Sequence, residues 1–202
     1  FGEGGGIDAP KGDLDGDGEI TSGDAIILLR VAVGLEEATD RMRSVGDVNE
    51  DGVLNAGDAI LIMRKAAGIA NGIFKPVAAS KPAGTVAARI VEVRPTESGR
   101  EIRIALDTDA AAGGDLRLVH EAFDRANVDV VGSNVLAVVN SEIPGTTRIS
   151  FVRGGTNPGA QTIELRVFLP RGVDKNALRL DGRLYGARGG PLAHVALGRT
   201  AP

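Results

Sequence analysis

Cysteine is absent from the 202-residue chain. This absence excludes disulfides, thiolate metal sites and cysteine nucleophiles, but it does not fix the cellular compartment. Aromatic residues are scarce, since there is no Trp, one Tyr and five Phe. Sugar rings and bases usually bind to exposed aromatic faces, so a carbohydrate-binding or single-strand nucleic-acid module has little support.

The chain also lacks a strong positive charge and a long apolar run. Its formal net charge of −4 argues against a nucleic-acid partner. There is no apolar stretch of membrane-spanning length and no charged-then-apolar signal segment. The chain begins with Phe1 rather than Met, so we expect a processed or excised piece, which is compatible with secretion.

Charge is distributed unevenly along the chain. Residues 1–70 hold 14 acidic against 6 basic side chains, whereas residues 71–202 hold 13 against 17. The apolar fraction of 43% is enough to build hydrophobic cores. Two domains of opposite net charge are therefore expected.

An internal repeat fills most of the acidic part. Residues 12–35 and 46–69 match at 11 of 24 positions with an offset of 34. Each copy is an Asp-rich loop followed by about three turns of apolar helical periodicity, predicting helices at 22–33 and 56–67 that stop at Gly34 and Gly68. The residues expected to form a small shared core are Ile26, Leu29, Val33, Ile60, Met63 and Ala67.

The pattern changes after the repeat. Residues 71–84 contain two Lys-Pro pairs among small residues and are predicted to be a linker. From residue 85 to 202, about nine short segments of alternating hydrophobicity are separated by breaks such as Gly113-Gly114 and Gly189-Gly190. This spacing predicts an antiparallel β-sandwich with polar residues, often Arg, on its outer face. The expected organisation is thus a small all-α domain at 1–70, a linker and a sandwich at 85–202.

Both Asp-rich loops fit the twelve-residue calcium loop of the EF-hand. That loop supplies oxygen ligands from positions 1, 3, 5, 7, 9 and 12 and turns at a glycine in position 6, here Gly18 and Gly52. Position 7 contributes a backbone carbonyl, which explains why Val53 is acceptable there. The predicted ligands are Asp13, Asp15, Asp17, Glu19, Thr21 and Asp24 in the first loop, and Asp47, Asn49, Asp51, Val53, Asn55 and Asp58 in the second.

Two such loops in register indicate two bound Ca²⁺ ions. The simpler alternative is an Asp/Gly-rich turn in which Asp24 and Asp58 only cap the following helices. Mg²⁺ is a weaker candidate because it requires a tighter octahedron. We expect chelation to unfold this half in part, since metal binding supplies folding free energy.

The loops end in Asp, no convincing helix precedes either loop, and the loop–helix unit is duplicated. This arrangement resembles the type I dockerin module of bacterial multi-enzyme complexes over about a third of the chain. Dockerins are non-catalytic and bind cohesin domains, which implies an extracellular or cell-surface protein with a cohesin-type partner. The positions that the resemblance assigns to docking are Ser22, Gly23, Leu29 and Arg30 in the first repeat, and Ala56, Gly57, Met63 and Arg64 in the second. Loop positions 10 and 11 are not the hydroxyl pairs common in that family.

The sandwich half resembles cohesin, itself a nine-stranded jelly roll, in segments such as Gly114–Leu118 and Thr162–Val167. The cohesin-like tyrosine–aspartate–proline segment is replaced by His120-Glu121-Ala122-Phe123. A generic immunoglobulin-like spacer is the alternative. Catalysis has little support, because His120 and His194 have no obvious partner, Ser133, Ser141 and Ser150 lack a nucleophile elbow, and Asp107 and Asp109 suit a turn better than a glycosidase dyad.

Three functions are therefore open. The first is a non-enzymatic assembly protein in which the dockerin of one copy docks on the cohesin-like sandwich of the next, giving filaments or rings. The second is a recruitment module, a dockerin plus spacer from a larger secreted enzyme captured by a foreign scaffold. The third is an enzyme with an unrecognised site in the sandwich.

Overall fold

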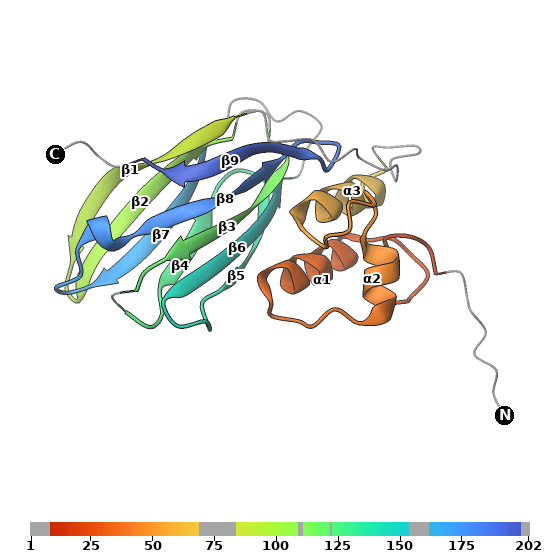
Figure 1. The fold of residues 1–202 in the computed structure, drawn as a ribbon, viewed down its shortest axis with the longest axis horizontal. Helices are drawn as coiled ribbons and strands as arrows, with labels where there is room; N and C mark the ends of the chain where they lie inside the picture. Colours follow the sequence, from red (N-terminus) through yellow and green to blue (C-terminus); the bar gives the residue numbers. More distant parts are fainter. Residues whose placement is uncertain (1–8, 69–83, 109–110, 122, 154–161, 199–202) are drawn as a thin grey trace.

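The computed structural model describes residues 9–68, 84–108, 111–121, 123–153 and 162–198. A helical region and a β region lie side by side, with the helices against one end of the strands (Figure 1). The predicted linker lies outside the described residues except for Gly84. The elements are α1 Ser22–Val33, α2 Asp40–Gly46, α3 Ala56–Ala66, β1 Thr85–Thr96, β2 Gly99–Asp107, β3 Gly113–Val119, β4 Asn127–Val131, β5 Val135–Asn140, β6 Thr146–Arg153, β7 Thr162–Pro170, the 3₁₀ turn η1 Lys175–Ala177, β8 Arg179–Tyr185 and β9 Pro191–Leu197.

The two main helices form where the repeat predicts them. Thr21 caps α1 and Asn55 caps α3. In each helix the carboxylate of the third residue accepts a hydrogen bond from the backbone N–H of the cap residue. Helix α1 ends at Gly34, whose φ of 78° is the left-handed conformation that glycine tolerates. Helix α3 ends at Ala66, one residue before the predicted end.

Two expectations about this region are wrong. No helix was expected before either loop, but the short helix α2 precedes the second one. Its seven residues are too few and too polar to show a helical period. The Thr39 side chain caps its start by accepting a hydrogen bond from Met42 N. Ile26 is 37% exposed and Ala67 is exposed. The buried face of α1 is instead formed by Ala25 and Leu28 together with the expected Leu29 and Val33.

The strands run in the order β4-β7-β2-β1-β9-β8-β3-β6-β5. Strand β1 joins two layers, because its first residues pair in parallel with β9 and the rest pair antiparallel with β2. Strand β1 changes partner between Ala88 and Arg89, and its register with β2 shifts just beyond this point, between Ile90 and Glu92. The predicted nine-stranded sandwich is confirmed, with one parallel pair at this crossover.

Alternating residues of both layers fill a common core around the fully buried Phe151. Gly113 and Gly114 do not break the chain as expected, but lie inside β3. A Cβ on Gly114 would lie 2.8 Å from the carbonyl oxygen of Arg183 and 2.9 Å from the Phe151 ring. Glycine in this strand therefore marks a close approach of neighbouring groups.

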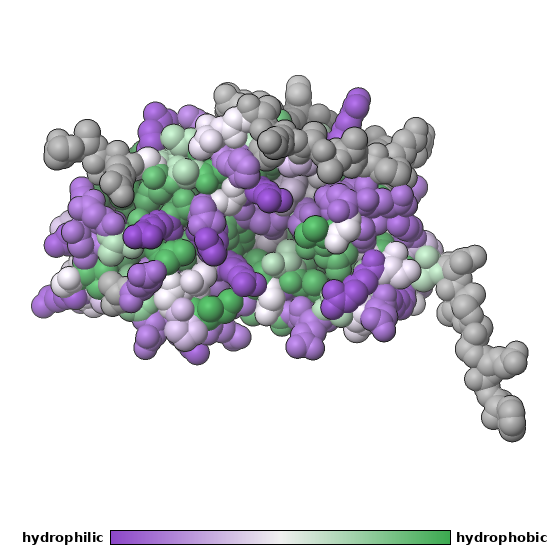
Figure 2. Space-filling model, viewed as in Figure 1, coloured by the Kyte–Doolittle hydropathy of each residue, from purple (hydrophilic) through white to green (hydrophobic). Residues whose placement is uncertain are grey.

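The helical region packs on the outer face of the layer that contains β3, β5 and β6. Helix α1 contacts β5 and β6, and α3 contacts β3 and β6. One hydrophobic cluster includes Leu28, Leu29 and Leu61 of the helices together with Val152 and Tyr185 of the strands. The space-filling view shows the two regions meeting without a continuous channel between them, under a mixed polar and apolar surface (Figure 2). Every helix within the described ranges is too short or too polar to cross a membrane.

Candidate metal centre and docking surface

The first Asp-rich loop is folded around its own carboxylates. Asp13 accepts hydrogen bonds from the backbone N–H of Gly16 at 2.6 Å and of Gly18 at 3.2 Å. Asp24, which is fully buried, accepts from Leu14 N at 2.7 Å and from Thr21 N at 2.8 Å. The loop thereby closes from its first ligand position to its last.

The second loop repeats three of these four bonds at equivalent positions, and in the fourth Asp51 N takes the place of Glu50 N, the equivalent of Gly16 N. Asp47 accepts from Asp51 N at 3.1 Å and Gly52 N at 3.0 Å. Asp58 accepts from Val48 N at 3.0 Å and from Asn55 N at 3.2 Å. Shared hydrogen bonding at an offset of 34 residues explains the duplicated motif in structural terms.

Each loop gathers carboxylate oxygens into a small volume. Oxygens of Asp13, Asp15 and Asp17 lie within 4.8 Å of one another, as do those of Asp47, Asp51 and Asp58. Burial, with smaller contributions from the Asp51 and Asp47 charges, raises the pKa of Asp58 to about 7. A divalent cation would remove this electrostatic penalty, and an all-oxygen donor set suits Ca²⁺.

The remaining predicted ligands occupy varied positions. Val53 is 57% exposed and Glu19 is exposed, so their side chains point away, as a backbone ligand at position 7 requires. Thr21 and Asn55 already accept from Gly23 N and Gly57 N as helix caps. Asp24 lies outside the 4.8 Å group of the first loop, whereas the equivalent Asp58 belongs to that of the second. Calcium coordination by these twelve residues stays a prediction.

The start of α3 is buried against the sandwich. The backbone N–H of Ala56 donates to the Asp115 carboxylate of β3 at 3.2 Å. Ser150 and Tyr185 also hydrogen bond to this carboxylate, while burial raises the pKa of Asp115 above its ordinary value. A Cβ on Gly57 would lie 2.4 Å from the carbonyl oxygen of Gly189, in the turn between β8 and β9. Only a residue without a side chain fits there.

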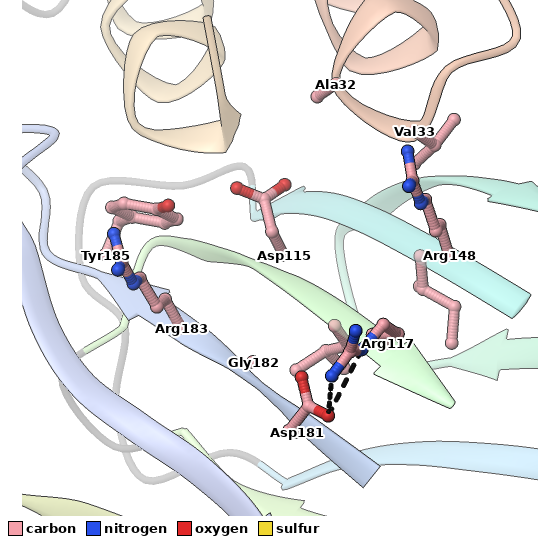
Figure 3. Close-up of a pocket in the computed structure, with 11 residues that line it drawn as sticks. Ala32, Val33, Asp115, Arg117, Arg148, Asp181, Gly182, Arg183 and Tyr185 are labelled. Atoms are coloured by element: carbon pink, nitrogen blue, oxygen red, sulfur yellow. Dashed lines mark hydrogen bonds and ion pairs between the residues drawn. The ribbon is translucent and has the colours of Figure 1, made fainter. Parts of the chain in front are cut away.

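The end of α1 meets the same face. The Asn140 side chain donates to the carbonyl oxygen of Val33 at 2.9 Å and is 3% exposed. Between α1 and the strands lies a cavity of about 220 Å³. Figure 3 shows Asp115 pointing from β3 toward the helices, beside Tyr185 and Arg183, with the Arg117–Asp181 ion pair farther from them. The sandwich therefore offers a carboxylate to one helix N-terminus and an amide donor to one C-terminus, matching both helix dipoles.

The eight positions assigned to docking do not share one environment. Ala56 and Gly57 lie in the contact with the sandwich, whereas the equivalent Ser22 is exposed and Gly23 half-buried. Leu29 is fully buried in the shared cluster, and Met63 packs against it. Arg30 is exposed and pairs with Glu36 at 3.2 Å, and Arg64 is half-buried. Their docking role stays a prediction.

Sequence reasoning missed the sandwich side of this contact. Asp115, Asn140, Tyr185 and Gly189 are far from the repeat in sequence, and nothing next to them marks them as partners of the helices. The one available signal was the pair Gly113-Gly114 within an apolar strand, because glycine in a strand marks close packing. A Cβ on Gly113 would lie 3.0 Å from the Ile60 side chain of α3.

Two of the remaining polar candidates, His120 and Asp107, have structural partners. His120 is fully buried, stacks on Phe123 with ring centroids 4.5 Å apart and bonds to Thr147 at 3.0 Å. His194 is exposed. Asp107 pairs with Arg89 at 3.2 Å, and Asp109 lies outside the described residues.

Residues 11–66 match the family model described as the dockerin type I domain. No curated protein matches the chain. Two solved structures are similar to it at low identity. A non-cellulosomal cohesin from the hyperthermophilic archaeon Archaeoglobus fulgidus is 12% identical, with a TM-score of 0.33, over 56% of this chain and 91% of that chain. An uncharacterized protein from Nocardia farcinica with an immunoglobulin-like fold is 13% identical, with a TM-score of 0.31, over 58% and 88%.

Proposed function

We propose that this chain, whose residues 11–66 form a dockerin region, is a non-catalytic, calcium-dependent assembly protein of the extracellular space. Its dockerin region docks on the face formed by β8, β3, β6 and β5 of a cohesin-like sandwich. Docking occurs within one chain, and between copies when chains join head to tail.

The contact between the dockerin region and the sandwich carries this proposal. It combines a shared apolar cluster with directional bonds at both ends, from Ala56 N to Asp115 and from Asn140 to Val33 O. Leaving such buried polar groups without partners costs about 1–3 kcal/mol each, so the bonds fix one orientation of docking. Burial of leucine side chains supplies most of the attraction.

Calcium dependence is supported by the position of the loops at the base of the docking helices. The two oxygen clusters lie within the segments that lead directly into α1 and α3. The carboxylates of Asp24 and Asp58 belong both to these loops and to the first turns of the helices. Bound calcium would hold each helix start in place, and its loss would release both docking helices.

Docking between copies is supported by the opposite net charges of the two regions, and the length of the segment that joins them limits which sandwich each dockerin region can reach. The acidic residues 1–70 and the basic residues 71–202 attract one another across chains as well as within one. Residues 69–83 could span at most about 50 Å if fully extended. Pairing between copies is heterologous, so it continues into rings or filaments unless the chain closes on itself. The tether favours self-closure in dilute solution, because it keeps the partner at a high effective concentration.

The test uses two chains that cannot close on themselves. Gly57→Ala places a methyl group against the Gly189 carbonyl and disables the dockerin region. Asp115→Arg turns a cation toward the N-terminus of α3 and disables the sandwich. Each variant keeps one working surface, so an equimolar mixture in millimolar calcium should form a one-to-one complex by light scattering. Each variant alone, and the mixture in chelator, should remain monomeric.

A mixture that stays monomeric in calcium would overturn docking between copies. Capture of the Asp115→Arg chain by an unrelated cohesin, without pairing in the mixture, would support recruitment to a foreign scaffold instead. Circular dichroism of each variant in calcium checks that both are folded.

A further inference from the structure

The two calcium loops face different surroundings. Asp15, at position 3 of the first loop, is exposed, whereas Asn49, at the same position of the second loop, is fully buried. Asn49 faces the turn between β8 and β9 of the sandwich, since its side-chain Nδ2 lies 3.3 Å from the carbonyl oxygen of Gly189. Only the second loop therefore makes this contact at position 3.

The Asn49 amide makes two kinds of bond at once. Its Nδ2 donates to Gly189 O and to Asp51 Oδ2, the latter at 3.0 Å. Its Oδ1 points into the loop, where it accepts from Asp51 N at 3.0 Å. An amide can present its oxygen to a cation while its nitrogen donates to the sandwich. A carboxylate at this position could not donate, and it would repel the Gly189 carbonyl.

The Gly189 carbonyl is a fixed acceptor. Gly189 is buried, adopts a positive φ of 74° and donates from its own N–H to Gly186 O at 2.9 Å. Its carbonyl oxygen lies against both Asn49 and the Gly57 backbone of α3. Docking thus orients a ligand side chain of the second loop and seats the helix that the loop precedes.

The first loop is braced from within the dockerin region. Arg41 of α2 donates to the carbonyl oxygen of Asp13 at 3.0 Å and pairs with the Asp13 carboxylate at 3.2 Å. This support does not involve the sandwich, so it persists whether or not the region is docked.

We infer that calcium binding at the second loop is coupled to docking on the sandwich directly through the Asn49 amide, whereas calcium binding at the first loop is coupled to docking only through α1 and therefore more weakly. The inference rests on the docking of the proposed function, but it concerns one loop within one chain. Such coupling is reciprocal. If calcium in the second loop strengthens docking by some factor, docking strengthens calcium binding at that loop by the same factor. Loss of one hydrogen bond of ordinary net strength, about 1 kcal/mol, corresponds to a factor of about five.

Tyr185 provides a probe of this coupling. It is the one tyrosine, there is no tryptophan, and it is buried in the contact. Its hydroxyl hydrogen bonds to the Asp115 carboxylate, which also accepts from the backbone N–H of Ala56 within the second loop's twelve residues. Tb³⁺ replaces Ca²⁺ at oxygen sites and emits when a nearby tyrosine is excited. Emission sensitised by Tyr185 should therefore report a second loop that is both loaded and docked.

A matched pair of substitutions separates the two loops. Asn49→Asp gives the second loop the residue of the first, keeping an oxygen ligand but losing the donor to Gly189. Asp15→Asn makes the reverse exchange in the first loop. We expect Asn49→Asp to lose part of the Tyr185-sensitised terbium emission although it still binds the ion. Asp15→Asn should keep that emission and weaken calcium binding at one site.

The reciprocal measurement is calorimetric. In Asp115→Arg, which is undocked, one calcium site should weaken about fivefold and the other distinctly less. Two unchanged sites, or two equally weakened sites, would overturn the coupling. Full sensitised emission from Asn49→Asp would overturn the role of the amide. The coupling is measured within single chains, whereas the assembly test measures pairing between two chains. Failure of the variants to pair therefore leaves the coupling intact, and the two failures are distinguishable.

Discussion

Asp115 of β3 accepts a hydrogen bond from the backbone N–H of Ala56, the first residue of α3, at 3.2 Å. The side chain thus acts on a helix N-terminus that belongs to the other region of the molecule, where negative charge is favourable. Asn140 performs the opposite task at the C-terminus of α1, where it donates to Val33 O. The two polar residues define both the position and the direction of the docked helices.

Removing the Asp115 carboxylate should weaken docking. Asp115→Ala leaves Ala56 N, Ser150 and Tyr185 without their shared acceptor. We expect a loss of about 1–3 kcal/mol in the free energy of unfolding in calcium, measured with urea. Asp129→Ala, an exposed carboxylate on β4, is the control and should change stability by less than about 0.5 kcal/mol. Equal effects from both variants would contradict the capping role.

Reversing the polarity at Asn140 should be worse than truncating it. Asn140→Asp keeps the acceptor for Glu142 N but places negative charge against the carbonyl end of α1. We therefore expect Asn140→Asp to destabilise the calcium-loaded chain more than Asn140→Ala, by about 1 kcal/mol. Thermal unfolding compares them, and the reverse order would show that the amide does not serve the helix end.

Chelation should affect the two regions differently. Without a cation, the clustered carboxylates of the loops repel one another, and burial opposes ionisation of Asp58. We expect chelator to remove most of the helical signal in circular dichroism while the strands remain folded on their own core. Calcium, added back in excess, should restore the helices. Unchanged helicity after chelation would contradict a structural role for the metal.

Alkaline pH should report on the buried contact through Tyr185. Burial, and then the neighbouring Asp115 carboxylate, raise the pKa of its hydroxyl above the ordinary value. Above about pH 10 the unfolded chain loses this proton while the docked chain keeps it, so stability should fall as pH rises. The ultraviolet absorbance of tyrosinate follows the single tyrosine directly. Asp115→Arg should move the midpoint back toward the ordinary value, and a wild-type midpoint already near that value would place Tyr185 in solvent.

The local features of the dockerin region could be predicted because their causes are close in sequence. Asp13 bonds to residues three and five positions away, and the capping boxes of α1 and α3 each span three positions. The family match over residues 11–66 confirms the resemblance that these loops carry. Helix α2 escaped notice because seven largely polar residues give no period.

The docking surface could not be predicted, because its partners are far apart in the chain. Ala56 and Asp115 are separated by 59 positions, and Asn49 and Gly189 by 140. A single Asp or Asn in a strand carries no sign of the helix that it will cap. The exchange of Asp15 for Asn49 between the repeats was visible in the sequence, but its reason is spatial, since only the second residue faces a carbonyl of the sandwich.

The most direct test of docking is the radius of gyration of the chain in dilute solution, measured by small-angle X-ray scattering. Gly57→Ala and Gly23→Ala alter equivalent positions of the two helices, but only the first places a methyl group against the sandwich, 2.4 Å from Gly189 O. In millimolar calcium the wild type and Gly23→Ala should be equally compact, and Gly57→Ala should be distinctly larger, as should the wild type in chelator. A Gly57→Ala chain as compact as the wild type would contradict the docked arrangement of the helices on the sandwich.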